Sequence, residues 1–282
     1  MQVTLFTPDA SYEQFRSVWE ARIALYVDLL KPLDLTIEPI AWTDARPVRP
    51  AWAQLAWGYH LQPARWDALL AAWPHEVPLV NAPALLRWNS DKRYLDQLAA
   101  AGVPVVPTRF AALADEAALA AARAAFATDQ LVVKPRISAS AAGTSRVGPG
   151  DPAPRLPDAM IQPFIASVQD QGELSIFFFG GERAHAVRKV AAAGDFRVQR
   201  EYGGAFTPAQ PDADQLAVAR AALAAAPELP LYARVDLVRD AAGAPRVMEL
   251  ELVEPDLYLD LAPDAGAGFA ARLAETMRST GG

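Results

Sequence analysis

The stretch RVMELELVEP, residues 246–255, alternates apolar residues with glutamate and therefore predicts a β-strand with two different faces. Side chains in a strand point to the same side at every second residue, so Glu249 and Glu251 share one face. A polar strand face is usually solvated, and for an isolated pair of glutamates this is the simpler interpretation.

The sequence just before this stretch favours a more specific interpretation. LYARVDLVRD, residues 231–240, predicts another strand, and DAAGAP between the two strands is a turn signal. If the strands form a hairpin with Arg239 opposite Arg246, then Asp236 lies opposite Glu249.

Like charges directly opposite each other destabilise a sheet, and a cation between them would remove the repulsion. Carboxylate oxygens suit Mg²⁺, which proteins often hold with one or two carboxylates together with substrate phosphates. We therefore hypothesise that Asp236, Glu249 and Glu251 form a magnesium site that works with a nucleotide.

The composition excludes several classes of protein. The chain has 282 residues, 52% of them hydrophobic, which is enough for a sizeable core in one large domain or two to three smaller ones. Its net charge of −7 and pI of about 5.1 argue against a general nucleic-acid binder, which needs a basic face. Because there is no cysteine, disulfides and thiolate chemistry are excluded. No signal peptide or membrane span is recognisable, so we expect a cytoplasmic protein without membrane or nucleic-acid partners.

Lysine is rare in this chain. Of 26 basic residues only four are lysine, namely Lys31, Lys92, Lys134 and Lys189. Lysine is a compact point charge whereas arginine is a bulky planar fork. Lysines that persist against this bias therefore mark positions where arginine would not serve equally well.

Strands alternate with helices over roughly the first 85 residues, which predicts a parallel α/β unit. The expected strands lie at 2–6, 35–42 and 77–83, and the expected helices lie at 11–30 and 62–73. Pro39 in the second strand favours an edge position or an early end.

The middle of the chain alternates in the same way. Ser90 suits an N-cap for a helix over 91–101, with Gly102 just past its end. The following expected elements are a strand at 103–110, a helix at 114–126, a strand at 130–137 and a small-residue loop at 138–154. From about residue 160 the pattern becomes β-rich, with strands expected at 160–165, 173–181, 183–190 and 195–202, and helices at 212–226 and 266–279.

Two lysines stand where a phosphate could bind. Lys134 ends an apolar strand before the small-residue loop, whose backbone N–H groups could approach an anion, although the loop lacks the P-loop pattern. A lysine that reaches solvent from a strand end is the simpler interpretation of Lys134 alone. Lys92 opposes a helix dipole and so needs an anionic partner, either a ligand or a neighbour such as Asp91 or Asp96.

Between these motifs and the hairpin, Pro163 interrupts an apolar segment and leaves backbone groups that a sheet need not use. Adenine could bind such groups at Gln162, Phe164 and Ile165, and Glu173 could accept hydrogen bonds from a ribose. An ordinary strand and turn is the alternative. The histidines do not have a metal-binding spacing.

In order along the chain, NSDK, VVKP before the small-residue loop, QPFI with GE, and ARVDL ahead of MELE resemble the ATP-grasp superfamily, which includes glutathione synthetase and D-alanine–D-alanine ligase. The resemblance covers almost the whole chain and is weakest before residue 80. Its most specific part is the terminal R-x-D followed by E-x-N. LLRWNSDKRYLDQLAAAGVPVVPT and GELSIFFFGGERAHAVRK are similar to the branch of cyclo-ligases that form D-cycloserine from O-ureido-D-serine.

The resemblance implies an ATP-grasp fold of class α/β (α+β overall). Its parts would be a Rossmann-like N-terminal unit at 1–88, a central lid-type subdomain at 89–165 and a C-terminal subdomain with the metal site at 166–282. It implies ATP as cofactor together with Mg²⁺, or Mn²⁺ in its place. The nucleotide residues that it implies are Lys92, Lys134, Ser138, Ser140, Gly143, Gln162, Phe164, Ile165 and Glu173.

The resemblance also implies that Arg234 stabilises charge on the transferring groups and that Asp236, Glu249 and Glu251 are the metal ligands. The family commonly has asparagine where this chain has Glu251, which adds a negative charge. The extra charge should tighten metal binding, or oblige a cation such as Arg188 or Arg197 to compensate.

Ligases of this kind transfer the γ-phosphoryl group of ATP to a carboxylate, and an amine then displaces phosphate. We expect a small amino-acid-like substrate that faces the catalytic arginines Arg188, Arg197 and Arg234. The expected substrate contacts are Tyr202, Gly203 and Gly204 on one side and Trp57 and His60 on the other, although the last two would equally suit packing in a small core. The alternatives are a ligase that modifies peptides or proteins and a nucleotide-binding regulator without turnover, and a homodimer is compatible with all three.

Overall fold

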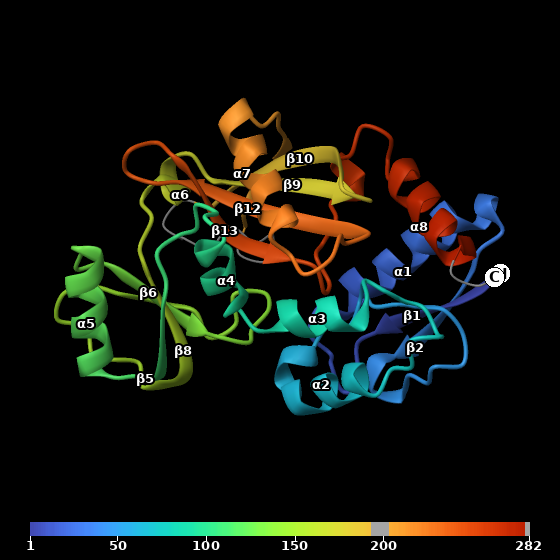
Figure 1. Ribbon diagram of the computed structural model, residues 1–282, viewed down its shortest axis with the longest axis horizontal. Coiled ribbons are helices and arrows are strands. Elements are labelled where there is room, and N and C mark those ends of the chain that lie inside the picture. The colour runs from blue at the N-terminus through green and yellow to red at the C-terminus, as the bar shows by residue number, and fades with distance from the viewer. Residues whose placement is uncertain (193–202, 280–282) are drawn as a thin grey trace.

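A computed structural model describes residues 1–192 and 203–279, which form three β-sheets with helices packed against them (Figure 1). This mixture confirms the expected α/β class. Each sheet falls within one of the three expected units, 1–88, 89–165 and 166–282. The boundaries between the units stay a prediction.

The N-terminal sheet is parallel in the order β2-β1-β3-β4, as the alternation of strands and helices predicted. Its strands are β1 (Gln2–Thr7), β2 (Thr36–Ala41), β3 (Ala51–Trp52) and β4 (Leu79–Val80). The expected edge position of the strand with Pro39 is confirmed, because β2 has a partner on one side only.

The helices of this unit are α1 (Arg16–Leu30), α2 (Pro63–Ala71) and α3 (Pro83–Ser90), with the 3-10 turns η1 (Lys31–Leu33), η2 (Trp42–Asp44) and η3 (Tyr59–Leu61). The helix expected over 11–30 begins only at Arg16. Phe15, just before it, has a left-handed backbone with φ of 59°, which interrupts a helix.

The second sheet is antiparallel in the order β5-β8-β6-β7. Its elements are α4 (Tyr94–Ala100), β5 (Arg109–Ala114), α5 (Glu116–Phe126), β6 (Leu131–Pro135), β7 (Ser145–Val147) and β8 (Leu156–Pro163). The strand expected at 103–110 begins only at Arg109, because Pro104 and Pro107 cannot donate to a ladder. The loop expected at 138–154 contains the short strand β7.

Ser90 is not an N-cap, and that expectation was wrong. Ser90 is the last residue of α3, and its hydroxyl donates to the carbonyl of Leu86 and accepts from the indole of Trp66. The next helix, α4, begins only at Tyr94. Gly102 does follow that helix with φ of 84°, as expected.

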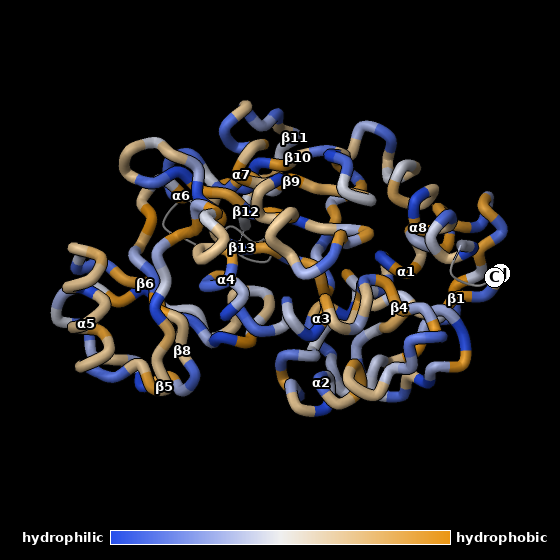
Figure 2. The backbone as a smooth tube through the Cα atoms, viewed as in Figure 1, coloured by the Kyte–Doolittle hydropathy of each residue, from blue (hydrophilic) through white to orange (hydrophobic). Residues whose placement is uncertain are grey.

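The third sheet is antiparallel in the order β11-β10-β9-β12-β13. Its elements are α6 (Ser167–Asp170), β9 (Glu173–Phe179), β10 (Glu182–Val190), β11 (Ala205–Pro208), α7 (Ala213–Ala224), β12 (Tyr232–Arg239), β13 (Pro245–Glu251), η5 (Leu259–Leu261) and α8 (Ala267–Ser279). Figure 2 shows hydrophobic residues along β9 and β12 at the centre of this sheet. The strand expected at 195–202 lies outside the described residues.

The two faces of the third sheet differ in chemistry. One face carries Leu174, Ile176 and Val235, which are buried against apolar residues of α4 and α7. On the other face, cross-strand pairing of β12 with β9 and β13 places Asp236 opposite both Ser175 and Glu249. The apolar face fixes the sheet, so the polar face can present charged side chains in defined positions.

The N-terminal sheet and the third sheet share one hydrophobic core. Trp52 of β3 and Tyr26 of α1 belong to the same buried cluster as Phe177 of β9 and Phe269 of α8. Helices α1 and α8 pack against each other, as Figure 1 shows. This shared core holds the N-terminal unit over the polar face of the third sheet.

Candidate functional site

A cavity of about 530 Å³ lies where the three units meet. Its wall includes most of the expected nucleotide residues, together with Arg234, Glu249, Glu251 and Trp57. The nucleotide residues in the wall are Lys92, Lys134, Ser138, Ser140, Gln162, Phe164, Ile165 and Glu173. The structure therefore brings together residues that are far apart in the sequence.

The hairpin β12–β13 forms one wall, and its register is as expected at the site. Asp236 pairs with Glu249, and Arg234 pairs with Glu251. The expected pairing of Arg239 with Arg246 is wrong, because Met248 is an extra residue in a β-bulge and Arg239 instead faces Pro245. The bulge shifts the turn end of the hairpin by one residue without disturbing the acidic end.

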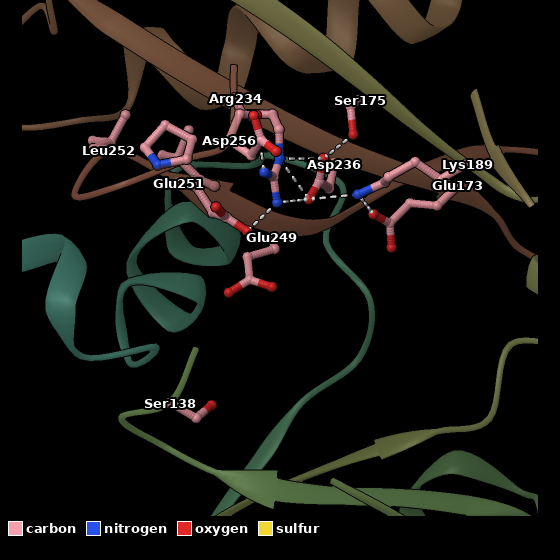
Figure 3. Close-up of polar contacts among 12 residues, drawn as sticks. Ser138, Glu173, Ser175, Lys189, Arg234, Asp236, Glu249, Glu251, Leu252 and Asp256 are labelled. Atoms are coloured by element: carbon pink, nitrogen blue, oxygen red, sulfur yellow. Dashed lines mark hydrogen bonds and ion pairs between the residues drawn. The ribbon is translucent and has the colours of Figure 1, made fainter. Parts of the chain in front are cut away.

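Arg234 is the centre of a buried ion network on this wall (Figure 3). Its Nε lies 3.1 Å from both carboxylate oxygens of Asp236, and its Nη2 donates to Asp236 and Glu251. Burial alone would lower the pKa of Arg234, but the charges of Asp236 and Glu251 outweigh it and raise the pKa well above its usual range. The guanidinium is therefore a fixed positive charge.

Asp236 and Glu173 are joined through Lys189, which sequence reasoning did not place in the site. The Lys189 ammonium forms ion pairs with Asp236 at 3.1 Å and with Glu173, and Ser175 donates to Asp236 at 2.5 Å. Burial opposes ionisation of Asp236, but Arg234 and Lys189 lower its pKa below the usual range. The sequence signal that could have identified Lys189 is the rarity of lysine, because Lys189 is one of only four lysines in the chain.

Glu251 is the acid whose charge is least neutralised among the expected metal ligands. Burial raises the pKa of Glu251 to about 7 against the lowering effect of Arg234, and the charges of Glu249 and Asp236 add to the rise. The expected compensating cation, Arg188 or Arg197, is instead Arg234 within the described residues. An added cation near Glu251 would therefore stabilise this wall.

Arg188 does not face the cavity. It pairs across the strands with Leu174 on the apolar side of the sheet, and its guanidinium donates to the carbonyl of Gln171 at 2.7 Å. Its neighbour Lys189 faces the site instead, because side chains alternate along a strand. A catalytic role for Arg188 stays a prediction, and Arg197 lies outside the described residues.

The second wall holds Lys92 and the loop that precedes β7. The Lys92 ammonium lies 3.0 Å from Glu249 and 2.8 Å from the carbonyl of Ser138. Burial opposes ionisation of Glu249, but the charges of Lys92 and Lys134 outweigh it and lower the pKa of Glu249. Lys92 thus connects the loop to β13, and Figure 3 shows Ser138 across from Glu249.

Lys134, at the end of β6, has no hydrogen bond or ion pair within the described part of the chain. Burial lowers its pKa, and the charge of Glu249 opposes this effect. A half-buried ammonium without a partner can bind an anion such as a phosphate.

The segment expected to meet adenine lines the cavity beside β8. The backbone N–H of Phe164 is not free, because it donates to the carbonyl of Gln130 at 2.8 Å. The Gln162 side chain donates to Thr108, and the Arg146 guanidinium stacks 3.9 Å from the ring centroid of Phe164. The N–H of Phe164 is therefore not available to adenine, and contacts of adenine with Gln162, Phe164 and Ile165 stay a prediction.

The remaining expected contacts are dispersed. His60 lies on η3 outside the residues that line the cavity, and Gly143 lies in the loop without reaching it. Gly203 and Gly204 precede β11 and do not line the cavity, while Tyr202 is outside the described residues. Asp236 lies behind Arg234 rather than in the wall.

No group of three or more acidic, histidine or cysteine side chains among the described residues is arranged to hold a metal ion. Across the described ranges, no helix combines the length and the apolar character that crossing a membrane requires.

Comparison with known proteins identifies relatives of the chain. No protein-family model matches it. The cycloserine biosynthesis protein DcsG of Streptomyces lavendulae is 36% identical over 252 residues, which cover 79% of this chain and 81% of DcsG. The crystal structure of the D-cycloserine synthetase DcsG matches with a TM-score of 0.81 and 30% identity, over 98% of this chain and 100% of that one.

More distant structures share the fold. D-alanine–D-alanine ligase from Bacillus anthracis matches with a TM-score of 0.70 and 17% identity, over 100% of this chain and 97% of that one. The ATP-grasp ligase PsnB matches with a TM-score of 0.68 and 14% identity, over 99% and 98% of the two chains. The chain therefore belongs to the ATP-grasp superfamily of ATP-dependent ligases that form C–N bonds, in the branch that contains DcsG.

Proposed function

We propose that this ligase activates the carboxylate of a small amino acid as an acyl phosphate and closes a ring by attack of a nitrogen in the same molecule. The observation that carries the proposal is the convergence of Lys92, Lys134 and Arg234 on one cavity that Glu249 and Glu251 also line. Similarity to a D-cycloserine synthetase over most of the chain supports a substrate such as O-ureido-D-serine.

The proposed reaction has two steps. A carboxylate oxygen attacks the γ-phosphorus of ATP, which releases ADP and leaves the acyl phosphate. The nitrogen then attacks the acyl carbon, phosphate leaves and the nitrogen loses a proton. The protein contributes positive charge and position, because phosphoryl transfer needs little covalent help.

The residues of the cavity suit these demands. Lys134 lacks an anionic partner in the described chain and is available to a phosphate, and Arg234 is held rigidly by Asp236. The volume of about 530 Å³ is typical of a site for small molecules, and a nucleotide would fill most of it. This favours a small second substrate over a peptide or protein segment.

A divalent cation fits the chemistry of the acidic wall. Glu249 and Glu251 are hard oxygen donors that share a face, and each is about 25% exposed. We propose that they hold Mg²⁺, or Mn²⁺ in its place, which would neutralise phosphate charge. Asp236 is already the counter-ion of Arg234 and Lys189, so its expected part as a metal ligand requires that network to rearrange.

The decisive experiment measures ADP release with O-ureido-D-serine, D-alanine and D-serine, in the wild type, in Glu249→Gln and in the exposed control Glu228→Gln. We expect release with the ureido compound in the wild type and the control, and loss in Glu249→Gln. Trapping with hydroxylamine should give a hydroxamate if the acyl phosphate forms.

Nucleotide binding should be measured separately by thermal unfolding with a non-hydrolysable ATP analogue, with and without Mg²⁺. A ligand at about 100 times its Kd stabilises the fold by about 2.7 kcal/mol. Binding without ADP release for any amino acid would overturn the ligase proposal in favour of a nucleotide-binding regulator. A homodimer and a cytoplasmic location belong to the proposal, and light scattering would test the first.

A further inference from the structure

Part of the cavity wall, called here the second end, is formed by residues other than the expected nucleotide residues. It is formed by the first half of α1 and the residue before it, by residues before and within η3, and by residues that follow β13. The side chains that define this end are Phe15, Arg22, Trp57, Tyr59, Glu254 and Tyr258. Four of these six are aromatic and two are charged, which gives this end a character different from the lysine-rich nucleotide end.

The acids around this end have internal partners, with one exception. Glu251 is paired with Arg234, and Asp256 accepts a hydrogen bond from Arg22 at 2.9 Å. Glu254 lies between these two acids in the chain, lines the cavity and has no hydrogen bond or ion pair within the described ranges.

A buried carboxylate without a partner lowers the stability of the free protein, and a ligand that pairs with it would remove this cost. Glu254 is mostly buried, and burial together with the charge of Glu251 raises its pKa well above the usual range. The cations whose charges act on Glu254 are Arg234 and Lys92, and they are already paired with Asp236 and Glu249. The missing partner must therefore come from the ligand, and it must carry positive charge or donate hydrogen bonds.

The surroundings of Glu254 favour an ammonium group as that partner. Trp57, Tyr59 and Tyr258 line the same cavity, the charge of Glu254 acts on Tyr59, and aromatic faces attract cations. An α-amino acid has its ammonium and carboxylate on the same carbon atom. A carboxylate held near Arg234, whose charge acts on Glu254, therefore brings its ammonium group to this acid.

We propose that Glu254 binds the α-ammonium group of the substrate and selects amino acids over carboxylic acids that lack the amine. This inference rests on the proposed function, because it takes the substrate carboxylate to lie near Arg234. It assigns a specificity role to a residue that none of the motifs in the sequence marks.

The test compares O-ureido-D-serine with 3-(ureidooxy)propanoic acid, which lacks only the α-amine, as substrates for ADP release. In the wild type the amino compound should have the higher kcat/KM. Glu254→Gln keeps the shape and removes the charge, so the ratio of the two kcat/KM values should fall by about 10- to 100-fold, which corresponds to one hydrogen bond to a charged group. Glu254→Asp should keep part of the preference, and Glu228→Gln should keep all of it.

The effect should appear in KM for the amino compound, while stabilisation by the ATP analogue stays at the wild-type level. An unchanged ratio in a folded Glu254→Gln that still binds nucleotide would overturn the inference and leave the proposed function intact. Equal kcat/KM values for the two compounds in the wild type would also overturn the inference and leave the proposed function intact. No ADP release from the wild type with either compound would contradict the proposed function, and the role of Glu254 with it.

Discussion

Lys92 and Lys134 face the same cavity from different elements, and they differ in whether their ammonium groups have partners in the protein. Lys92 is held by Glu249 and by the carbonyl of Ser138. Lys134 has no such partner in the described part of the chain. The charge of Lys92 therefore stabilises the free protein as well as any ligand, whereas the charge of Lys134 is available to the ligand alone and costs free energy until one binds. Arg234, like Lys92, is paired within the free protein, and its ion network is the most extensive example of such pairing in the site.

The largest effect is expected at Arg234. Arg234→Met leaves Asp236 and Glu251 without their shared cation, and removal of one partner from a buried pair costs about 3–5 kcal/mol in the free energy of unfolding. Urea denaturation of the free protein would measure it. A loss below about 1 kcal/mol would mean that Lys189 alone neutralises this wall, and the contrast between the walls would disappear.

Lys92→Met should have an intermediate effect. It removes the ion pair with Glu249 and the bond to the loop carbonyl, and Glu249 is about 25% exposed, so we expect a loss of about 1–3 kcal/mol. The same denaturation experiment with the ATP analogue should show weakened nucleotide binding as well. If Lys92→Met weakened nucleotide binding without changing stability, Lys92 would, like Lys134, contribute to ligand binding and not to the stability of the free protein.

The pH dependence of stability reports on His60, which lies near Lys92. Burial, with a smaller contribution from the charge of Lys92, lowers the pKa of His60 from 6.5 to about 4. Well above pH 6.5 the imidazole of His60 is neutral in both the folded and the unfolded chain. Between pH 6.5 and pH 4 it takes up a proton mainly in the unfolded chain. The contribution of His60 to stability should therefore fall by about 1 kcal/mol between pH 7 and pH 5, after allowance for partial exposure. It is measured as the difference between the wild type and His60→Gln, because the raised pKa of Glu251 makes the contribution of that acid change in the opposite direction.

Between pH 7 and pH 5 the free energy of unfolding should fall by about 1 kcal/mol more in the wild type than in His60→Gln. The control His75→Gln, whose ring is almost fully exposed, should behave like the wild type. In Lys92→Met the fall should be smaller, because one cause of the shift has been removed. An equal fall in wild type and His60→Gln would assign the pH dependence to other groups.

The smallest change in stability is expected at Lys134. Lys134→Met removes a half-buried charge without a partner, so the free protein should change by less than about 1 kcal/mol or become more stable. The stabilisation produced by the ATP analogue should nevertheless be lost. If Lys134→Met destabilises the free protein as much as Lys92→Met does, the proposed difference between the two lysines is wrong.

The acidic end of the hairpin could be predicted from sequence because it depends on local rules. Alternation placed Glu249 and Glu251 on one face. The pairing of Asp236 with Glu249 was predicted from a turn register that is wrong by one residue, and the bulge at Met248 offsets that error. The bulge at Met248 could not be predicted in this way. In the bulge two residues of β13 lie opposite one residue of β12, and the local hydrophobicity pattern does not indicate where this happens.

Long-range hydrogen bonds account for the expectations that failed near residue 90. The side-chain amide of Asn89 bonds to the backbone at the end of β13, where it donates to the carbonyl of Leu250 and accepts from the N–H of Leu252 just past the strand. Ser90 is occupied by Trp66 and Leu86. The local sequence resembles the start of a helix, but partners elsewhere in the chain use the groups that a cap would need.

The second end of the cavity was largely invisible in the sequence. Arg22 and Asp256 are 234 positions apart, and neither belongs to a motif. Lys189 left a faint compositional signal, because lysine is rare in this chain, whereas Glu254 was visible only as one more acid after the strand.

The shared core of α1, β3, β9 and α8 has a consequence for how the chain folds as it is made. Tyr26 and Trp52 emerge from the ribosome early, but Phe269, which packs against both, is among the last described residues to be made. The N-terminal sheet must therefore wait with its apolar side uncovered until more than two hundred further residues have been added. We expect nascent chains to depend on chaperones during this interval, and variants that loosen α8 to aggregate during synthesis rather than lose activity once folded.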